Sequence, residues 1–330
     1  MKFGAVKLAQ AEGAILAHSV PVSGRRLRKG SLLTREDIAA LAATGAKEVI
    51  VAQLASNDVG EDRAADLLGR AIAGSDPGIE VTRAFTGRVN LLAKQSGVVD
   101  LGVPALHAVN AVDPMITVAT VPPWQQMTVG GMIATVKIIS YAVHQERLDH
   151  AIAAAGTRSV RLRPPALKAA TLIVTEIANG PGEKGKEAIA ARLAALNVDL
   201  ARVVTVTHDL PALAAALRTT ATDLVLILTA SATSDIEDVA PAAVRAAGGE
   251  VDRFGMPVDP GNLLFLGRIG ARHVIGLPGC ARSPALNGAD WVLSRVICGV
   301  PPTAGDIGAM GVGGLLKEIP SRPQPRQRRR

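Results

Sequence analysis

The residue types best suited to chemistry stand directly after the predicted β-strands of the second half of the chain. Strands rich in Val, Ile, Leu and Thr are predicted at 171–176, 203–207, 223–229 and 273–277. In open α/β sheets, ligands bind beyond the carboxyl ends of the strands. The candidate site residues at such positions are Glu176, His208, Asp209, Thr229, Ser231, Thr233, Ser234, Asp235, Pro260, Gly261, Asn262, Gly279, Arg282 and Ser283.

The run 229–235 has the composition of a phosphate-binding loop. It places hydroxyl and small side chains between a strand and a helix, where backbone N–H groups can approach an anion and the helix N-terminus adds positive potential. A structural alternative is that Ser234 caps the following helix, since Glu237 stands three residues later as in a capping box. Both roles stay open for Ser234.

The start of that helix decides where Asp235 lies. Pro241 in a helix interior would cost ~3 kcal/mol, so the regular helix could instead begin near Asp238. Asp235 would then lie in the loop and could face a ligand. We therefore place Asp235 with Glu176 at a candidate Mg²⁺ site, because this ion takes oxygen ligands.

The segment after the last predicted strand combines turn, cap and charge signals. Gly279 allows a tight turn, and Ser283 is the predicted N-cap of a helix from 284 to about 298. The Arg282 guanidinium matches phosphate geometry, although a solvent-exposed or ion-paired arginine is the alternative. Cys280 is either a thiol activated by the helix N-terminus or an ordinary buried cysteine.

Helices are predicted to alternate with these strands. They lie near 183–196 and 210–218, and a further one ends at Gly248-Gly249. Asp209 is the predicted N-cap of the second, and His208 either holds a ligand or lies on the rim. This alternation predicts an α/β fold with a three-layer, mainly parallel sheet.

The first half of the chain predicts a mixed α+β domain. A capping box at 34–37 opens a helix that Gly45 ends, and a strand follows at 48–54. A second helix is predicted at 61–73, and residues 79–144 alternate β-branched runs with Gly and Pro.

The extended run ending in Pro164-Pro165 is the predicted linker between domains. We expect an N-terminal domain at 1–165, an α/β domain at 166–305 and a C-terminal extension with a basic tail at 306–330.

Composition and charge narrow the function classes. Hydrophobic residues make up 48% of the chain and aromatic residues 2%, so aliphatic side chains must fill the cores. Five of the seven net positive charges come from the tail arginines Arg322, Arg326, Arg328, Arg329 and Arg330. This argues against nucleic-acid binding, because neither a basic body face nor an aromatic stacking platform is present.

Membrane and disulfide signals are also missing from the sequence. The longest uncharged stretch, 114–136, is interrupted by Pro and Gly pairs, and no signal peptide opens the chain. The two cysteines, Cys280 and Cys298, lack metal-ligand spacing. We expect a cytoplasmic protein that is not bound to membranes.

Two segments carry a resemblance to a known family. The runs PVDPGNLL at 257–264 and GLPGCARSP at 276–284, within a region of about 166–320, resemble the molybdopterin-binding domain of molybdopterin adenylyltransferases and molybdenumtransferases. The region is most similar to the variant attached to bacterial molybdenum cofactor cytidylyltransferases. Residues 8–52 resemble the opening region of such proteins.

The resemblance implies a ligand and partners. The ligand is molybdopterin or Mo-molybdopterin, a pterin phosphate held by the loop after the third strand, with Mg²⁺ as a further candidate. By position, Asp209 matches the family's acidic residue after the second strand, and Asp235 the one after the glycine-rich loop. A molybdenum cofactor cytidylyltransferase or a molybdoenzyme is the implied partner, and we expect a homo-oligomer.

The sequence departs from the family pattern at its most specific turns. The Thr-Gly-Gly-Thr/Ser loop reads Thr-Ala-Ser-Ala-Thr at 229–233, the Gly-Asp-Glu-Leu turn reads Val-Thr-Glu-Ile at 174–177, and Pro-Gly-Asn-Pro reads Pro-Gly-Cys-Ala at 278–281. Side chains at 230 and 231 narrow the room for backbone contact with a phosphate. Catalysis is therefore less expected than binding.

Two functions follow as hypotheses. The first is a carrier or regulatory module for cofactor maturation. The sequence shows no Gly-rich nucleotide-binding segment like that of a cytidylyltransferase, so it resembles only the molybdopterin-binding part of such proteins. The alternative is a metal-dependent nucleotidyl- or molybdenumtransferase acting at the pterin phosphate, with Asp235 and Asp209 as the catalytic residues that handle metal or protons. A dinucleotide-binding dehydrogenase is disfavoured because no G-x-G-x-x-G follows the first strand of the α/β domain.

Overall fold

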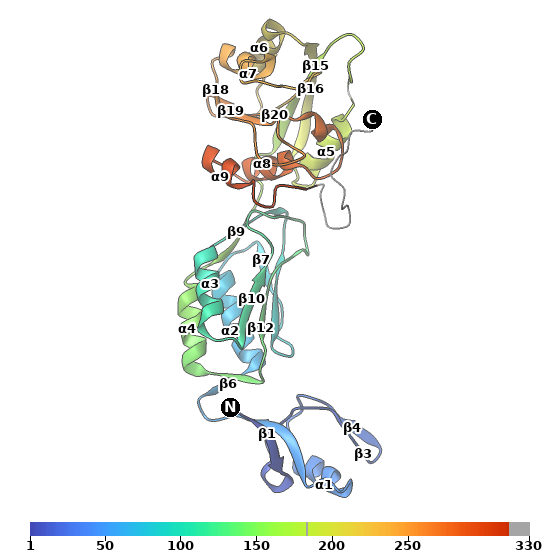
Figure 1. The fold of residues 1–330 in the computed structure, drawn as a ribbon, viewed down its shortest axis with the longest axis vertical. Coiled ribbons are helices and arrows are strands. Elements are labelled where there is room, and N and C mark those ends of the chain that lie inside the picture. The colour runs from blue at the N-terminus through green and yellow to red at the C-terminus, as the bar shows by residue number, and fades with distance from the viewer. Residues whose placement is uncertain (183, 317–330) are drawn as a thin grey trace, which may run out of the picture. The chain divides into compact units, whose positions relative to one another are not determined.

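A computed structural model describes residues 1–182 and 184–316 of the chain. The chain divides into two units (Figure 1). Unit 1 comprises residues 1–94, 99–123 and 129–162, and unit 2 comprises 95–98, 124–128 and the chain from 163 onward. The arginine tail of the sequence prediction lies outside the described residues.

Unit 1 begins with a small antiparallel sheet in which β5 lies between β1 and β2. Its elements are β1 (Lys2–Lys7), β2 (Ile15–Leu16), β3 (Val20–Val22), β4 (Arg25–Leu27), α1 (Arg35–Ala43) and β5 (Glu48–Gln53). The predicted capping box is confirmed: the Thr34 side chain accepts from Asp37 N, and the Asp37 side chain accepts from Thr34 N. Gly45 follows the helix in the left-handed conformation at φ 84°.

The rest of unit 1 contains a four-stranded antiparallel sheet of order β10-β12-β8-β7. Its elements are β6 (Asp58–Gly60), α2 (Glu61–Ala73), β7 (Ile79–Val81), β8 (Arg88–Ala93), α3 (Val103–Val112), β10 (Ile116–Thr120), β12 (Met132–Ile138), β13 (Ala142–His144) and α4 (Gln145–Ala155). Strands β9 (Gly97–Leu101) and β14 (Val160–Arg163) cross from one unit to the other, and β11 (Gln126–Met127) belongs to unit 2. Helices α2, α3 and α4 lie on one side of this sheet (Figure 1). The helix predicted at 61–73 is confirmed as α2.

The edge strand β10 is held by a side chain of α3. The Asn110 amide donates to Val118 O at 2.9 Å, and its carbonyl oxygen accepts from Val118 N at 2.7 Å. A single side chain thus makes both hydrogen bonds that a neighbouring strand would make to Val118.

Unit 2 is built on a six-stranded sheet of order β16-β15-β17-β20-β19-β18. Its elements are β15 (Ala169–Glu176), α5 (Lys186–Ala194), β16 (Asp199–Thr207), α6 (Leu210–Thr219), β17 (Leu224–Leu228), α7 (Val239–Ala246), β18 (Glu250–Phe254), β19 (Phe265–Ile269), β20 (Arg272–Leu277), the 3-10 turn η2 (Gly279–Arg282), α8 (Gly288–Ile297) and α9 (Ala304–Ala309).

The mixed α/β class is confirmed, but the strand directions correct the expectation of a mainly parallel arrangement. Strands β16, β15, β17 and β20 pair in parallel, whereas β19 and β18 join antiparallel. In unit 1, β8 pairs antiparallel with β7 and β12, and β12 with β10. The reason is local. Ile269 pairs with Arg272 across a two-residue turn that contains Gly270 at φ 58°, and such a turn can only join antiparallel strands.

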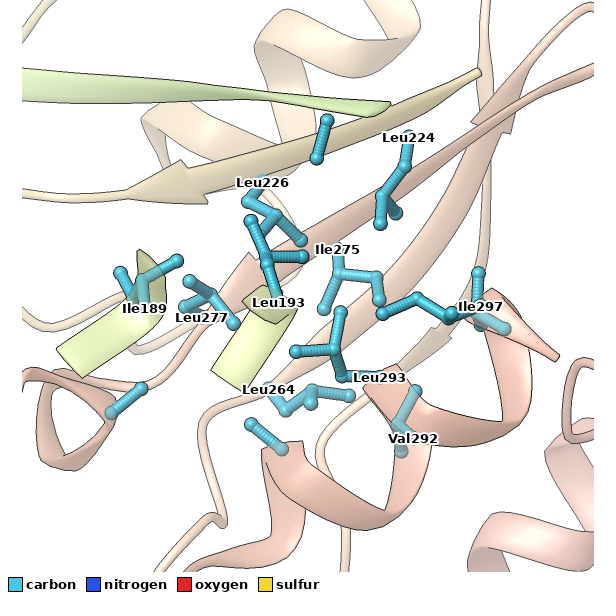
Figure 2. Close-up of a cluster of buried hydrophobic side chains, with 14 of the residues drawn as sticks. Ile189, Leu193, Leu224, Leu226, Leu264, Ile275, Leu277, Val292, Leu293 and Ile297 are labelled. Atoms are coloured by element: carbon cyan, nitrogen blue, oxygen red, sulfur yellow. The ribbon is translucent and has the colours of Figure 1, made fainter. Parts of the chain in front are cut away.

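Helices cover both faces of this sheet because successive strand residues point to opposite faces. Leu224, Leu226 and Leu228 of β17 belong to a core cluster with residues of α5 and α8. Val225 and Ile227 belong to a second cluster with residues of α6 and α7. Figure 2 shows the first cluster, in which Leu193 and Leu293 approach the sheet beside Leu226 and Ile275.

One position in β20 has no room for a side chain. A Cβ added at Gly276 would lie 1.9 Å from Cε1 of Phe265, which is 1% exposed in the neighbouring strand. The aromatic ring occupies the space above Gly276 and fills the second cluster.

Among the helices of the described residues, none combines the length and the apolar character needed to cross a bilayer.

Candidate functional site

The carboxyl ends of β15, β16, β17 and β20 meet along one edge of the sheet in unit 2. The parallel register sets Glu176 beside Thr207 and Val174 beside Leu228, and Leu228 beside Leu277. Residues that follow these strands are therefore neighbours, as the sequence pattern predicts for His208, the 229–235 loop and the turn at Gly279.

A chain of hydrogen bonds links three strand ends at this edge. The Thr175 hydroxyl oxygen lies 2.8 Å from Nδ1 of His208 and accepts from Ala230 N at 2.9 Å. The other ring nitrogen, Nε2 of His208, lies 3.0 Å from Oγ of Ser231. Thr175 is fully buried, whereas Ser231 is exposed, so the chain runs from the core to the surface. The sequence pattern places Thr175, His208 and Ser231 on the polar rim at the strand ends, but it does not predict the hydrogen bonds among them.

The 229–235 loop is held by its own hydroxyl groups. The Thr229 hydroxyl donates to Ser231 O at 2.6 Å and lies 3.4 Å from the Thr233 hydroxyl. Within the described part of the chain, the backbone N–H groups of Ser231, Ala232 and Thr233 have no acceptor. Three consecutive free N–H groups can bind an anion.

The structure decides between the two predicted starts of the following helix. Helix α7 begins at Val239, and Asp238 is its N-cap; one carboxylate oxygen accepts from Val239 N and the other from Ser234 N. Ser234 is therefore not the cap. Pro241 lies in the first turn of the helix, where its missing N–H breaks no intrahelical bond.

The predicted acidic residues differ in the number of hydrogen bonds that their carboxylates accept. Asp235 is exposed, and one of its oxygens accepts from Glu237 N at 2.8 Å. Asp209 is the predicted N-cap of α6: one oxygen accepts from Ala212 N at 2.8 Å, and the other from the Thr207 hydroxyl. These hydrogen bonds hold the pKa of Asp209 below its usual value, and the one from Thr207 has the larger effect.

We predict that Asp209 acts at this position as a cap. Asp209→Asn should keep most of the melting temperature and leave ligand binding near the wild-type level, because the asparagine oxygen still caps the helix although the charge is lost. Asp209→Ala should lower the melting temperature, and acidification should do the same. The lowered pKa means that the carboxylate's contribution is present above the unfolded-state pKa and is lost as pH falls through the folded-state value.

Circular dichroism melts of the three proteins, recorded between pH 3 and 7, measure this contribution. A wild-type-like Asp209→Ala protein combined with a defective Asp209→Asn protein would contradict the capping role.

Arg282 is placed at the predicted edge, but its guanidinium is turned toward main-chain carbonyls. It donates to Thr229 O at 3.0 Å, to Gly182 O at 3.2 Å and to Lys184 O. Burial lowers the pKa of Arg282 from its usual value. The side chain thus ties the 229–235 loop to the segment before α5.

Gly185 is required by the same packing. It adopts φ 98°, and a Cβ there would lie 2.6 Å from the Cα of Arg282. Only glycine lets the segment before α5 approach η2 this closely.

The predicted helix start at Ser283 is wrong. Helix α8 begins at Gly288, and the buried Asn287 is its N-cap in a capping box with Asp290. The Ser283 hydroxyl accepts from Ala285 N at 3.2 Å within the preceding loop. The signal was in the sequence, because Asn287 stands three residues before Asp290, as a capping box requires.

The loop between η2 and α8 is fixed by Arg192 of α5, which sequence reasoning missed. Its guanidinium donates to Asp290 Oδ1 at 2.5 Å, to Ala281 O at 3.0 Å and to Ser283 O at 2.8 Å. The side chain is 10% exposed. Arg192 thus fixes the position of the segment that contains Gly279 and Arg282.

Pro260, Gly261 and Asn262 lie in the loop between β18 and β19, at the same sheet edge, where β19 is the strand next to β20. Pro260 O accepts from Gly288 N at 2.8 Å, and a Cβ on Gly261 would lie 2.8 Å from that nitrogen. The Asn262 side chain donates to Met256 O at 3.3 Å. Pro260 and Gly261 thus contact the start of α8, whereas the Asn262 side chain bonds within its own loop.

The predicted magnesium ligands, Asp235 and Glu176, stay a prediction. No group of three or more His, Cys, Asp or Glu residues suited to a metal occurs within residues 1–182 and 184–316.

Gly279 has open space around its Cβ position, and Cys280 beside it is half-buried. Burial raises the pKa of Cys298 to about 12, so its thiol stays protonated.

A family model described as a domain of unknown function, DUF8806, matches residues 5–53. No curated protein matches the chain.

Two solved structures from molybdopterin biosynthesis are similar in part. The MoeA protein from Pyrococcus horikosii has 12% identity and a TM-score of 0.31, over 93% of this chain and 77% of that one. The MoaB enzyme from Thermus thermophilus has 19% identity and a TM-score of 0.31, over 41% of this chain and 99% of that one.

Proposed function

We propose that unit 2 binds molybdopterin or Mo-molybdopterin by its phosphate and serves as a carrier or regulatory module in molybdenum cofactor maturation. The observation that carries this proposal is the 229–235 loop. Its three consecutive N–H groups, at Ser231, Ala232 and Thr233, are without acceptors in the described residues and lie beyond the ends of parallel strands.

The choice of a pterin among phosphate esters rests on the sequence. The segments 257–264 and 276–284 resemble the molybdopterin-binding domain, and both lie at the same sheet edge as the 229–235 loop. No atom outside the neighbouring residues lies within 4 Å of a Cβ built at Gly279, so the main chain is open to approach there. A molybdenum cofactor cytidylyltransferase or a molybdoenzyme is the partner we propose for the bound cofactor.

Co-purified pterin tests the proposal. Protein isolated from molybdopterin-producing cells should carry a pterin that becomes fluorescent after oxidation. Ser231→Asp should reduce the bound amount at least about tenfold, because it places a negative charge among the N–H groups that would hold the phosphate.

The matched control is Ser56→Asp, the same substitution at an exposed turn of unit 1. Wild-type protein without pterin, or equal pterin in the two variants, would refute the proposal.

The alternative is a metal-dependent nucleotidyl- or molybdenumtransferase, for which Asp235 is the candidate catalytic residue. Asp209 favours the carrier instead, since both of its carboxylate oxygens already accept hydrogen bonds at the start of α6. Asp235 has a free carboxylate oxygen in the described structure and is the residue to test.

Asp235→Asn separates the two functions. For a carrier, removing a carboxylate beside a bound phosphate should leave the affinity for molybdopterin unchanged or raise it, because like-charge repulsion is relieved. The assay incubates both proteins with molybdopterin, Mg²⁺ and ATP or CTP, and measures nucleotide consumption and pterin binding in parallel. Metal-dependent consumption that the variant lacks would establish the transferase and end the carrier proposal.

A further inference from the structure

The buried Thr175 hydroxyl fixes the direction of the hydrogen-bond chain at the sheet edge. Its oxygen accepts from Ala230 N at 2.9 Å, and its own hydrogen also needs an acceptor because Thr175 is fully buried. Among the described residues, the acceptor within reach is Nδ1 of His208, at 2.8 Å. Thr175 is therefore the donor to His208.

This assignment determines where neutral His208 carries its proton. A ring nitrogen that accepts a hydrogen bond has no hydrogen, so the proton lies on Nε2. Nε2 is 3.0 Å from the Ser231 oxygen and donates to it. The Ser231 hydrogen is then unused, since Ser231 Oγ has no second partner in the described structure and the residue is exposed.

We propose that His208 is a positioning residue: Thr175 holds it in the Nε2–H tautomer, and it presents the Ser231 hydroxyl as a hydrogen-bond donor to a phosphoryl oxygen of the ligand. This inference rests on the proposed function and extends it to the residues that orient one donor. All three hydrogen bonds run in one direction: Ala230 N donates to Thr175, Thr175 donates to His208, and His208 donates to Ser231. The bonds therefore polarise one another.

The opposite direction would give the site another chemistry. If Ser231 donated to Nε2, His208 would act as a general base toward a serine nucleophile. Nδ1–H would then donate to Thr175, and the buried Thr175 hydrogen would have no acceptor among the described residues. The arrangement therefore serves binding and does not activate Ser231.

The tautomer can be observed directly in the ligand-free, full-length chain. Labelling the six histidines with ¹⁵N and comparing the spectrum with that of His208→Ala identifies the two ring nitrogens of His208. We expect a protonated Nε2 and an unprotonated Nδ1. Thr175→Val should abolish this preference, and Thr175→Ser should restore it.

The matched control is Thr171→Val. Thr171 is buried in the same strand and its hydroxyl is hydrogen-bonded to Thr222 at the other end of the sheet, so its loss costs packing and a hydrogen bond without touching His208. A protonated Nδ1 in the wild-type protein would overturn the inference even if the Thr175 variants fail to fold.

Titration with inorganic phosphate tests the donor. Ser231→Ala and Thr175→Val should each weaken phosphate binding about tenfold, the usual loss of one hydrogen bond to a charged group, while Thr171→Val should not. If Ser231→Ala binds phosphate as tightly as the wild-type protein, the inference is overturned but the proposed function is not. Absence of phosphate binding in the wild-type protein, with the Nε2–H tautomer present, would overturn the proposed function and the ligand part of the inference together.

Discussion

Replacing Arg192 with methionine is expected to lower the free energy of unfolding of unit 2 by roughly 3 to 5 kcal/mol, the usual cost of removing one partner of a buried ion pair. Arg192 is 10% exposed and Asp290, its partner, 17%. Methionine keeps the apolar stem but leaves the Asp290 carboxylate and the carbonyl oxygens of Ala281 and Ser283 without their donor. The loop before α8 should loosen first.

Urea unfolding followed by tryptophan fluorescence measures this loss in the full-length chain. The two tryptophans, Trp124 and Trp291, both belong to unit 2, so the signal reports that unit. Arg218→Met on α6 is the matched control, because the Arg218 guanidinium makes its hydrogen bond to Ala246 O at the protein surface. It should cost less than about 1 kcal/mol. Equal losses in the two variants would show that Arg192 does not hold the loop.

The second large effect is expected from a single added methyl group. Gly276→Ala would place a Cβ 1.9 Å from Cε1 of the buried Phe265 ring, so the ring or the strand must move. Overpacking of this kind costs about 1–3 kcal/mol and occasionally more. We expect a loss at the upper end, because the ring lies in the second core cluster with little room to shift.

A double-mutant cycle identifies the cause. Phe265→Leu alone should destabilise unit 2 by creating a cavity, but combined with Gly276→Ala it should recover part of the loss, since the smaller side chain makes room for the methyl group. Gly308→Ala, at a helical position with open space, should be neutral or slightly stabilising. Strictly additive losses in the double variant would mean that the two side chains do not collide.

Local signals explain which elements could be predicted from the sequence. The capping box at Thr34 and Asp37 and the amphipathic run of α2 are contained within a few residues, and the structure has both. The Asp209 cap is of the same kind. The prediction that Ser283 caps the last helix is wrong because two cap signals compete in this segment. Ser283-Pro284 is a good cap signal by sequence, but the helix begins after Asn287, whose side chain is buried in a capping box.

The site itself could be predicted only to the level of strand ends. That His208 and Ser231 follow neighbouring strands can be inferred from their order in the chain, but the part of Thr175 depends on the register of three strands. Likewise, nothing near Arg192 in the sequence indicates that it reaches Asp290, 98 residues away. Such partners are fixed by tertiary packing, which has no local pattern.

The Asn110 side chain of α3 has a consequence for the behaviour of unit 1 in a crowded solution. An edge strand with free N–H and C=O groups is a template on which another chain can add a strand and begin an aggregate. On β10, the amide of Asn110 already occupies both groups of Val118. A chain that approaches this edge must first displace a bonded amide, so α3 protects the sheet against growth from one side.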